Sequence, residues 1–378
     1  MAKTTKIIVG AIVAVVIIGG IWYGAGRKPA PVETEKEPIK IGAILPFTGK
    51  LGYYGDYYSH GLNLAIEEIN NAGGINGKKI EIIYEDNQGD TSQSITAYQK
   101  LSQTDGVKIY ITTLSGATLA LAPLVENNHD ILFNLNSAAP TISKAGDYTF
   151  RNNIFPLSEI KALSTFINQK DYNKIALLMF NNDAGVEYKD LFSEEYISNG
   201  GEIVGSELYE QGATDFRTQL TKIKAKNVDA IIMFAYANEG GLIIKQAKEI
   251  GVTAPFFSFY TSEDSKLIEV GGSATEGLIY THCFNESAAA SFKEILQKKH
   301  GTTAGLFYSA IAYDTLKILA KTLNNCDEKD TVCVKADLYN VKEYPGTSGI
   351  TTINADGDTE KSVFLKTIKN GQFVPLEN

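Results

Sequence analysis

The sequence alternates short apolar, β-rich runs with helical patterns, and this order restricts the fold more than any other feature. Ile39–Leu45 is the first such run, and a helical pattern follows it until Gly73 and Gly74 stop the helix. A chain that alternates in this way forms a parallel sheet that helices cover on both faces. In the first half, further strands are predicted at Ile80–Tyr84, Val107–Ile111 and Ile131–Asn134, and helices at Ile95–Leu101 and Leu119–Val125.

The same order restarts near residue 160 and predicts a second α/β sheet of similar size. Two open α/β sheets in one chain place their strand-end loops at a shared crevice, where ligands bind, and closure of the two lobes about a hinge is the expected motion. Helices are predicted at Ile160–Ile167, Tyr188–Ile197, Phe216–Lys224, Leu242–Ile250, Ala288–Lys299 and Leu306–Leu323. Strands are predicted at Lys174–Phe180, Glu202–Leu208, Ala230–Phe234, Phe256–Phe259 and Gly277–Thr281, and two late strands, Thr347–Ile353 and Ser362–Ile368, around a turn at 355–358.

One loop of the first half has the composition of an anion site. Leu114-Ser115-Gly116-Ala117-Thr118 joins a predicted strand to the next helix. Ser115 or Thr118 could cap that helix, and the unpaired N–H groups of its first turn would point at whatever lies in front of the strand. Because Gly116 lets the backbone approach closely, the loop suits a carboxylate or phosphate. An ordinary loop with a hydroxyl cap explains the same residues, and the two roles are compatible.

Charge and the N-terminus indicate an exported protein. The net charge is −9, and the first 28 residues hold four basic and no acidic residues, which leaves −13 for the rest and argues against binding nucleic acid. Lys3 and Lys6 precede Ile7–Ala25, an uncharged run close to the about 20 residues that span a bilayer. Residues 1–28 are expected to be an uncleaved membrane anchor, followed by an extended tether at 29–38. A signal peptide cleaved after Gly26 is the alternative.

The chain has three cysteines. Cys326 and Cys333 bracket a polar loop, and in an exported protein this spacing predicts a local disulfide. Two free thiols are the alternative. Cys283, next to Phe284, is expected to be a packed thiol.

The motifs of the common catalytic classes do not occur. The sequence has no Gly-x-Ser-x-Gly elbow, and its four histidines lack metal-ligand spacing. Residues 73–79 lack the spacing and the Ser/Thr of a phosphate loop, and the acidic turn at 354–358 lacks the closing Glu of a calcium loop. We therefore expect no enzyme, no cofactor and no metal site.

Four segments carry a family resemblance: Ile39–Pro46, Phe47-Thr48-Gly49, Tyr54-Gly55-Asp56 and Ala65–Gly77. They are similar to the leucine/isoleucine/valine-binding protein family, the type I extracytoplasmic solute-binding proteins of ABC transporters. The similarity runs through Ile39–Asn378. It implies the type I periplasmic binding protein fold, two doubly wound α/β lobes joined by three crossovers near Phe155, Cys283 and Lys361. The lobes would comprise residues 39–155 with 284–361, and 156–283 with 362–378.

The resemblance also implies a function. The protein would capture a small amino acid, branched-chain or otherwise apolar, between its lobes and deliver it to the permease of an ABC importer. It would be monomeric and extracytoplasmic, and the N-terminal run described above would hold it at the membrane. A ligand-sensing module of a membrane receptor is the competing interpretation, which neighbouring permease and ATPase genes would exclude. A binder of an amide, urea or carboxylate solute is another.

Six residues match ligand-binding positions of the family. Tyr54, at the cleft edge, and Tyr236, in the second lobe, would cover the side chain of the ligand. Ser115 matches the hydroxyl that holds the ligand carboxylate, which agrees with the composition of its loop. The backbone-and-hydroxyl segment after the fourth strand corresponds to Asn136, Ser137 and Ala138, with the family hydroxyl at Ala138 and Ser137 beside it.

Two positions depart from the family pattern. Ala184 stands where an aromatic residue is usual, and Tyr260 stands where branched-chain binders place the acid that pairs with the ligand ammonium. A buried ammonium without a partner is costly, so another acid is expected to replace it. Glu263 is the first candidate, and Glu239 and Asp183 are the others. A ligand without an ammonium is the alternative.

Overall fold

The structure, a computed structural model, describes residues 36–377. The membrane anchor expected at residues 1–28 lies outside the described residues, as does most of the tether. Within the described residues, no helix is long and apolar enough to cross a bilayer. Residues from Pro38 onward form one unit, and it contains all the elements described below.

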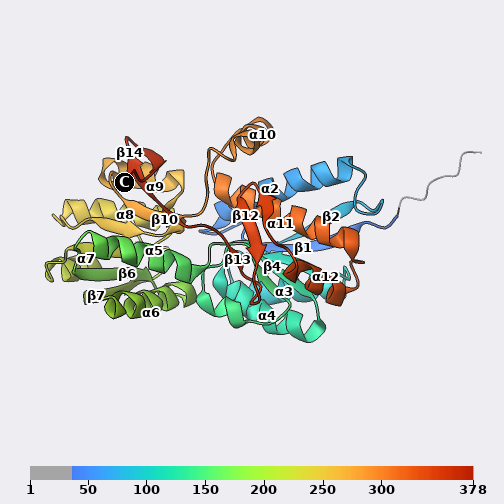
Figure 1. Cartoon of the computed structure of the whole chain (residues 1–378), viewed down its shortest axis with the longest axis horizontal. Coiled ribbons are helices and arrows are strands. Elements are labelled where there is room, and N and C mark those ends of the chain that lie inside the picture. The colour runs from blue at the N-terminus through green and yellow to red at the C-terminus, as the bar shows by residue number, and fades with distance from the viewer. Residues whose placement is uncertain (1–35, 378) are drawn as a thin grey trace, which may run out of the picture. The chain divides into compact units, whose positions relative to one another are not determined.

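The first sheet is parallel throughout, with the strand order β2-β1-β3-β4-β5. Side chains of β1 alternate between its faces: Ile44 packs with α3 and α4, whereas Ala43 and Leu45 join the cluster that includes α2. Helices therefore cover both faces, as the alternating pattern predicts (Figure 1). The elements are β1 (Ile39–Leu45), α2 (Gly52–Asn71), β2 (Ile80–Asp86), α3 (Thr91–Gln103), β3 (Ile109–Thr112), α4 (Ser115–Asn128), β4 (Ile131–Asn134), the 3₁₀ helix η1 (Pro140–Lys144) and β5 (Thr149–Arg151).

The second sheet has the strand order β15-β14-β10-β9-β8-β6-β7. Strands β6 to β10 run parallel, and β14 and β15 add an antiparallel edge. Its elements are α5 (Pro156–Gln169), β6 (Lys174–Phe180), α6 (Asp183–Ser198), β7 (Glu202–Tyr209), α7 (Arg217–Lys224), β8 (Ala230–Phe234), α8 (Ala237–Glu249), β9 (Phe256–Ser258), η2 (Tyr260–Ser262), α9 (Ser265–Gly271), η3 (Gly272–Thr275), β10 (Ile279–His282), β14 (Phe364–Lys369) and β15 (Gln372–Pro375).

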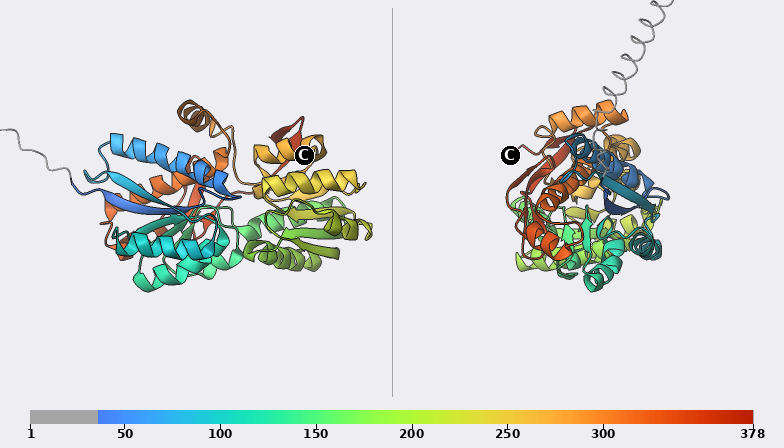
Figure 2. Two further views of the ribbon diagram at one scale, coloured as in Figure 1. Left: turned by 180° about the vertical axis from the view of Figure 1, so that it is seen from behind. Right: turned by 90° about the vertical axis from the view of Figure 1, so that its right-hand side faces the viewer.

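The last third of the chain returns to the first sheet before β14. Helix α11 packs along α2, and α10 contacts both, as two views show (Figures 1 and 2). A small antiparallel sheet follows, formed by β11, β12 and β13. The elements are α10 (Ala290–His300), α11 (Leu306–Asn325), α12 (Thr331–Tyr339), β11 (Tyr344–Gly346), β12 (Gly349–Ile353) and β13 (Thr359–Glu360).

Both predicted late strands exist, as β12 and β14 on either side of the turn at 355–358, but they do not pair with each other. The turn at 355–358 joins β12 to the short strand β13, and these two pair with each other. The second predicted strand, β14, instead pairs with β10 of the other sheet. Its Lys366 is buried there and forms an ion pair with Glu263 at 2.6 Å. Local periodicity predicts that a strand exists, but not which distant edge it joins.

Three connections run between the two sheets and their helices. They are 152–155, between β5 and α5; 283–289, between β10 and α10; and 361–363, between β13 and β14. The Thr359 hydroxyl donates to the Asn153 carbonyl at 2.7 Å, so the first and third connections adjoin. We call the part built on the first sheet, with α10–α12 and β11–β13, the first lobe, and the part built on the seven-stranded sheet the second lobe.

Two of the three cysteines form a disulfide, and the third lies in a connection between the lobes. A disulfide joins Cys326 and Cys333, whose Cα atoms are 5.7 Å apart. The stretch that they bracket is not a simple polar loop: α12 begins at Thr331, and Asp330 accepts a hydrogen bond from the Cys333 N–H at 3.1 Å. Cys283 is free and buried, and burial raises the pKa of its thiol to about 12.

Candidate functional site

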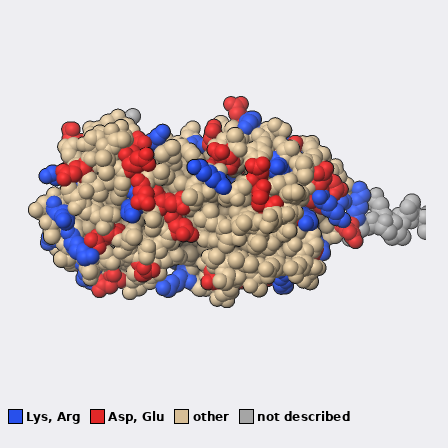
Figure 3. All heavy atoms as spheres, turned by 90° about the horizontal axis from the view of Figure 1, so that it is seen from below, with Lys and Arg blue, Asp and Glu red and all other residues tan. Residues whose placement is uncertain are grey.

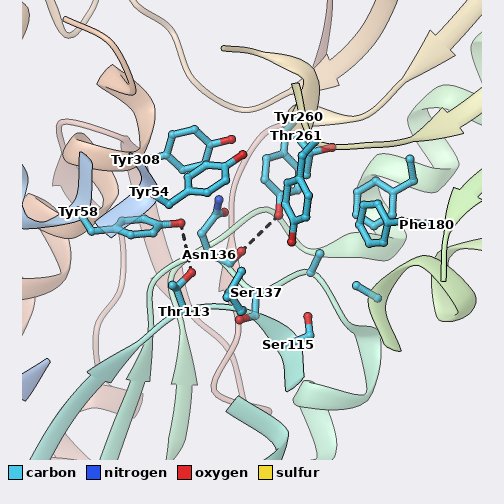
Figure 4. Close-up of a pocket in the computed structure, with 15 residues that line it drawn as sticks. Tyr54, Tyr58, Thr113, Ser115, Asn136, Ser137, Phe180, Tyr260, Thr261 and Tyr308 are labelled. Carbon is cyan, nitrogen blue, oxygen red and sulfur yellow. Dashed lines mark hydrogen bonds between the residues drawn. The ribbon is translucent and has the colours of Figure 1, made fainter. Parts of the chain in front are cut away.

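A pocket lies where strand-end loops of the two lobes meet (Figure 4). The space inside it is about 390 Å³, a value that includes space open to solvent. None of the described residues that line it is charged. They are Tyr54, Tyr58, Thr113, Leu114, Ser115, Asn136, Ser137, Ala138 and Tyr308 of the first lobe, and Phe180, Ala184, Phe234, Tyr236, Tyr260 and Thr261 of the second.

The start of α4 forms part of the pocket floor. The prediction that Ser115 or Thr118 caps this helix is wrong: the capping position is Leu114, which makes no side-chain cap, and its φ of 70° is unusual for a residue other than glycine. The Thr118 hydroxyl donates to the Leu114 carbonyl at 2.9 Å. The Ser115 hydroxyl accepts from the Ala139 N–H at 3.0 Å, so its own hydrogen is left for a ligand. The first turn of α4 thus has no side-chain cap, and its first residue, Ser115, lines the pocket.

The segment after β4 forms the rest of the floor, and buried polar groups hold it rigidly. The Ser137 N–H donates to Asn134 Oδ1 at 2.6 Å, and Arg151 donates to the Ala139 carbonyl at 2.8 Å. Asn136 Oδ1 has no hydrogen-bond partner among the described residues, although only 9% of this residue is exposed. An unpaired buried acceptor is costly, so this oxygen is a candidate contact for a ligand donor.

Aromatic side chains form the walls (Figure 4). Tyr54 lies in the first turn of α2, not in a loop, and Tyr236 occupies the capping position of α8. Their ring centroids are 5.8 Å apart across the two lobes. Burial raises the pKa of both hydroxyls, so both stay neutral. The Tyr54 and Tyr308 hydroxyls have no hydrogen-bond partner among the described residues.

Tyr260 spans the junction of the lobes. Its Oη accepts from Asn153 Nδ2 at 3.0 Å and donates to the Asn136 carbonyl at 3.4 Å. Its backbone N–H donates to Glu159 Oε1 at 3.3 Å. The residue is 1% exposed, so its ring, with the hydroxyl already bonded, forms a fixed part of the wall.

The structure gathers most of the residues that the sequence predicts for the site. Tyr54, Ser115, Asn136, Ser137, Ala138, Ala184, Tyr236 and Tyr260 all line the pocket. Their contact with a solute stays a prediction. Sequence reasoning missed seven lining residues, of which Tyr58 lies one helical turn after Tyr54 and could have been found by that spacing. Tyr308 comes from α11, far along the chain, and carries no local signal.

Glu263, predicted to pair with a ligand ammonium, lies outside the pocket lining. It accepts hydrogen bonds from Lys366 and from Tyr280, each at 2.6 Å. Burial alone would raise the pKa of Glu263, but His282 and Lys366 hold it below its ordinary value. Its charge is therefore already neutralised inside the second lobe. The other two candidates also lie outside the lining: Glu239 accepts from the Gly212 N–H at 3.0 Å, and Asp183 is exposed.

The surface charge agrees with the composition. On the face in Figure 3, Asp and Glu side chains form several groups, and Lys and Arg do not merge into a continuous patch. This face therefore offers no broad surface for a polyanion.

Comparison with known proteins places this geometry in context. The sequence model described as periplasmic binding protein matches residues 38–372. The Leu/Ile/Val-binding protein BraC3 of Rhizobium johnstonii is 25% identical over 352 residues, which cover 90% of this chain and 94% of BraC3. Among solved structures, a branched-chain amino acid substrate-binding protein from Streptococcus pneumoniae, in complex with isoleucine, is 28% identical, with a TM-score of 0.80, and covers 89% of this chain and 97% of its own.

A third protein shares the fold at lower identity. A solute-binding protein of Rhodopseudomonas palustris, in complex with 3,4-dihydroxybenzoic acid, is 21% identical, with a TM-score of 0.81, and covers 90% of this chain and 96% of its own. These likenesses confirm the predicted two-lobed α/β fold.

Proposed function

Because this chain belongs to the leucine/isoleucine/valine-binding family of type I periplasmic binding proteins, we propose that it captures a small solute carrying a carboxylate between closing lobes and delivers it to the permease of an ABC importer. One observation carries the proposal: the uncapped start of α4, with the Ser115 hydroxyl beside it, faces a pocket that both lobes line. Helix N-termini favour anions, and charge-assisted hydrogen bonds strengthen the contact.

The comparisons support a carboxylate more strongly than one particular solute. Isoleucine and 3,4-dihydroxybenzoic acid, the ligands named for the two solved structures above, differ in shape and in charge but share a carboxylate. An apolar amino acid is the first candidate from the named relatives, and its carboxylate would lie on Ser115 with Tyr54 and Tyr236 over its side chain. Its ammonium would need an acceptor, and the pocket lining offers no acidic side chain for it.

An extracytoplasmic location follows for a binding protein of an importer. We propose that residues 1–28 hold it at the membrane and that it works as a monomer. To test the anchor, cells would be fractionated and the N-terminus of the mature protein sequenced. Membrane-bound protein that retains residues 1–28 is expected, and a released form beginning near Arg27 would overturn the anchor while leaving export intact.

The proposed binding function has a direct test. The full-length protein would be purified under non-denaturing conditions and studied by native mass spectrometry for a bound small molecule. Small-angle X-ray scattering would then compare the protein before and after removal and return of that molecule. We expect a smaller radius of gyration with the solute, because the lobes close on it. A protein that carries no small molecule and does not change in size with any carboxylate offered would contradict the proposal.

A further inference from the structure

We propose that the solute has no ammonium group and consists of a carboxylate on a flat aromatic ring, and that Tyr260 sets this specificity. The inference rests on the proposed function, because it takes the pocket as the solute site. It goes further by choosing a chemical class that excludes the free amino acids.

The first observation is the absence of an anion for an ammonium to meet. All fifteen residues that line the pocket are uncharged. A primary ammonium has three N–H donors and a full charge, and burying it without a counter-charge is unfavourable. The acids within three residues of a lining residue all lie outside the lining, namely Asp56, Asp183, Glu187, Glu239, Glu263 and Asp264.

Four of these acids have another partner, and Asp56 and Asp183 are exposed. Glu187 accepts from Thr141. Glu263 pairs with Lys366, and Glu239 accepts from the Gly212 N–H. Asp264 caps α9 by accepting from the Lys266 N–H at 2.9 Å. Asp183 is exposed on the second lobe and lies opposite Gly116 of α4. A Cβ atom added to Gly116 would lie 3.8 Å from Asp183 Oδ2. Of the two exposed acids, Asp183 lies beside the start of α4, so it is the one that the experiment must exclude.

The second observation concerns Tyr260 itself. Its hydroxyl accepts from Asn153 and donates to the Asn136 carbonyl, so its one hydrogen is already engaged. An ammonium could still approach the oxygen, but it would meet a neutral group, because burial raises the Tyr260 pKa well above its ordinary value. Tyr260 thus lines the pocket with a neutral side chain whose hydroxyl hydrogen is already engaged.

The third observation is a run of stacked rings that ends in the pocket. Tyr188 stacks on Phe234 at 4.1 Å between centroids, Phe234 on Phe180 at 4.6 Å, and Phe180 on Tyr236 at 5.1 Å. The planes of the last pair differ by 9°. Tyr236 ends the run, and its other ring contact is Tyr54 of the opposite lobe, tilted by 58°. A flat ring that enters as the lobes open would extend this stack and be covered by Tyr54 on closure.

The polar floor supplies the other end of the ligand site. Ser115, Asn136 and Ser137 lie below the aromatic side chains in the same pocket (Figure 4). Asn136 Oδ1, buried and unpaired, would accept a hydrogen bond from a hydroxyl group on the ring of the solute. The arrangement of anion-binding floor, aromatic wall and missing counter-acid matches an arene carboxylate.

Titration calorimetry on the full-length protein, freed of bound solute, tests the class. The ligands are benzoate, 4-hydroxybenzoate, phenylacetate, cyclohexanecarboxylate, benzamide, leucine and phenylalanine. We expect at least one arene carboxylate to bind, both amino acids to bind at least about 100-fold more weakly, and cyclohexanecarboxylate to bind about three- to tenfold more weakly than benzoate. Failure of both arene carboxylates, benzoate and 4-hydroxybenzoate, overturns the inference, as does leucine binding as tightly as the better of the two. Leucine binding would leave the proposed function standing, whereas failure of the whole panel would count against both.

Three variants distinguish a change in ligand specificity from a general loss of folding stability. Tyr236→Leu should weaken benzoate about three- to tenfold and leave cyclohexanecarboxylate within about twofold, because only a flat ring gains from stacking. Tyr260→Glu should shift the ratio of the benzoate to the leucine dissociation constant toward leucine by at least about tenfold. Asp183→Asn is the control and should not change that ratio. An equal loss of all ligands in Tyr236→Leu, or a tenfold change in Asp183→Asn, contradicts the assignment, and circular dichroism checks that each variant is folded.

Discussion

The Ser115 hydroxyl accepts one hydrogen bond and still has its own hydrogen to donate. Its Oγ accepts from the Ala139 N–H at 3.0 Å, so the hydroxyl hydrogen is free to turn toward the pocket. The same contact fixes the position of Oγ at the start of α4. A carboxylate would then meet a fixed donor and the N–H groups of one helical turn.

Replacing Ser115 by Ala should therefore weaken binding of a carboxylate solute by tenfold or more, since a hydrogen bond to a charged group contributes about 1.5–3 kcal/mol. Calorimetry on both proteins measures the change. Ser59→Ala is the matched control, because the Ser59 hydroxyl bonds only within α2. An unchanged affinity for Ser115→Ala would mean that the carboxylate lies elsewhere.

Glu159 supports Tyr260 from behind and gives a prediction on pH. It is fully buried and accepts from Thr281 at 2.7 Å and Tyr188 at 2.9 Å, yet burial raises its pKa from 4.5 to about 7. Between these values the unfolded chain has lost the proton and the folded protein keeps it. The free energy of unfolding should therefore fall as pH rises from about 4.5 to 7, by about 3 kcal/mol from this group.

The variant Glu159→Gln has no proton to lose, so it should show a shallower fall over that range. Urea unfolding at pH 5, 6 and 7 in both proteins isolates the contribution of Glu159, because Asp264, Glu239 and the other groups with raised pKa values are common to both. Parallel pH profiles for the two proteins would rule out a raised pKa at Glu159.

The sequence allowed some of the pocket residues to be predicted, whereas others reach the pocket only through contacts between distant parts of the chain. Tyr54, Ser115 and Tyr236 stand at the ends of elements, where matching motifs are readable. Tyr308 could not be predicted, because α11 reaches the pocket only through its packing along α2. Glu263, predicted as an ammonium partner, lies outside the pocket lining and pairs with Lys366, from a strand about a hundred residues later. A distant partner leaves no trace in the neighbourhood of Glu263 in the sequence.

At the scale of elements, the alternation of strand and helix patterns predicted most of the strands and helices that the structure contains. Local periodicity predicted β1, β6 and β8 closely, since each is an apolar run between polar turns. It could not predict that β14 joins β10, nor that α12 begins inside a polar stretch with little amphipathic pattern. Helix α12 depends on the Asp330 cap and on the nearby disulfide instead.

The disulfide between Cys326 and Cys333 ties the end of α11 to α12, far from the pocket-lining residues. Changing both cysteines to Ser should lower the free energy of unfolding by about 2 kcal/mol, because the closed loop is short. Urea unfolding with and without a reducing agent measures this, and affinity for the solute should be unchanged. Weaker binding in the double variant would show that α11 transmits strain to Tyr308.

At the scale of the whole described unit, several polar contacts join the lobes around the pocket. Glu187 of α6 accepts from both the backbone N–H and the hydroxyl of Thr141, at 2.8 and 2.6 Å. Lys50 donates to the Gly212 carbonyl at 3.4 Å, and Tyr260 donates to the Asn136 carbonyl. These contacts exist only while the lobes are together. The pairing of the lobes followed from the family resemblance, whereas these individual contacts had no sequence signal.

Removing the Glu187 contact should destabilise the closed form. Glu187→Ala is expected to speed dissociation of the solute about two- to fivefold, the range for a partly exposed charged contact, with little change in association. Stopped-flow tyrosine fluorescence follows the rate. Glu194→Ala is the control, because Glu194 is an exposed acid on the same helix, α6. Equal rates in both variants would show that Thr141 and Glu187 do not hold the lobes together.

A crystal structure of the protein with benzoate, or with the solute that copurifies, tests the central claim most directly. The account predicts the carboxylate within about 3.2 Å of Ser115 Oγ and of a first-turn N–H of α4, with the rest of the molecule between Tyr54 and Tyr236. Density for the solute in the apolar groove lined by Phe166, Phe284 and Phe373, with the pocket between the lobes empty, would contradict it.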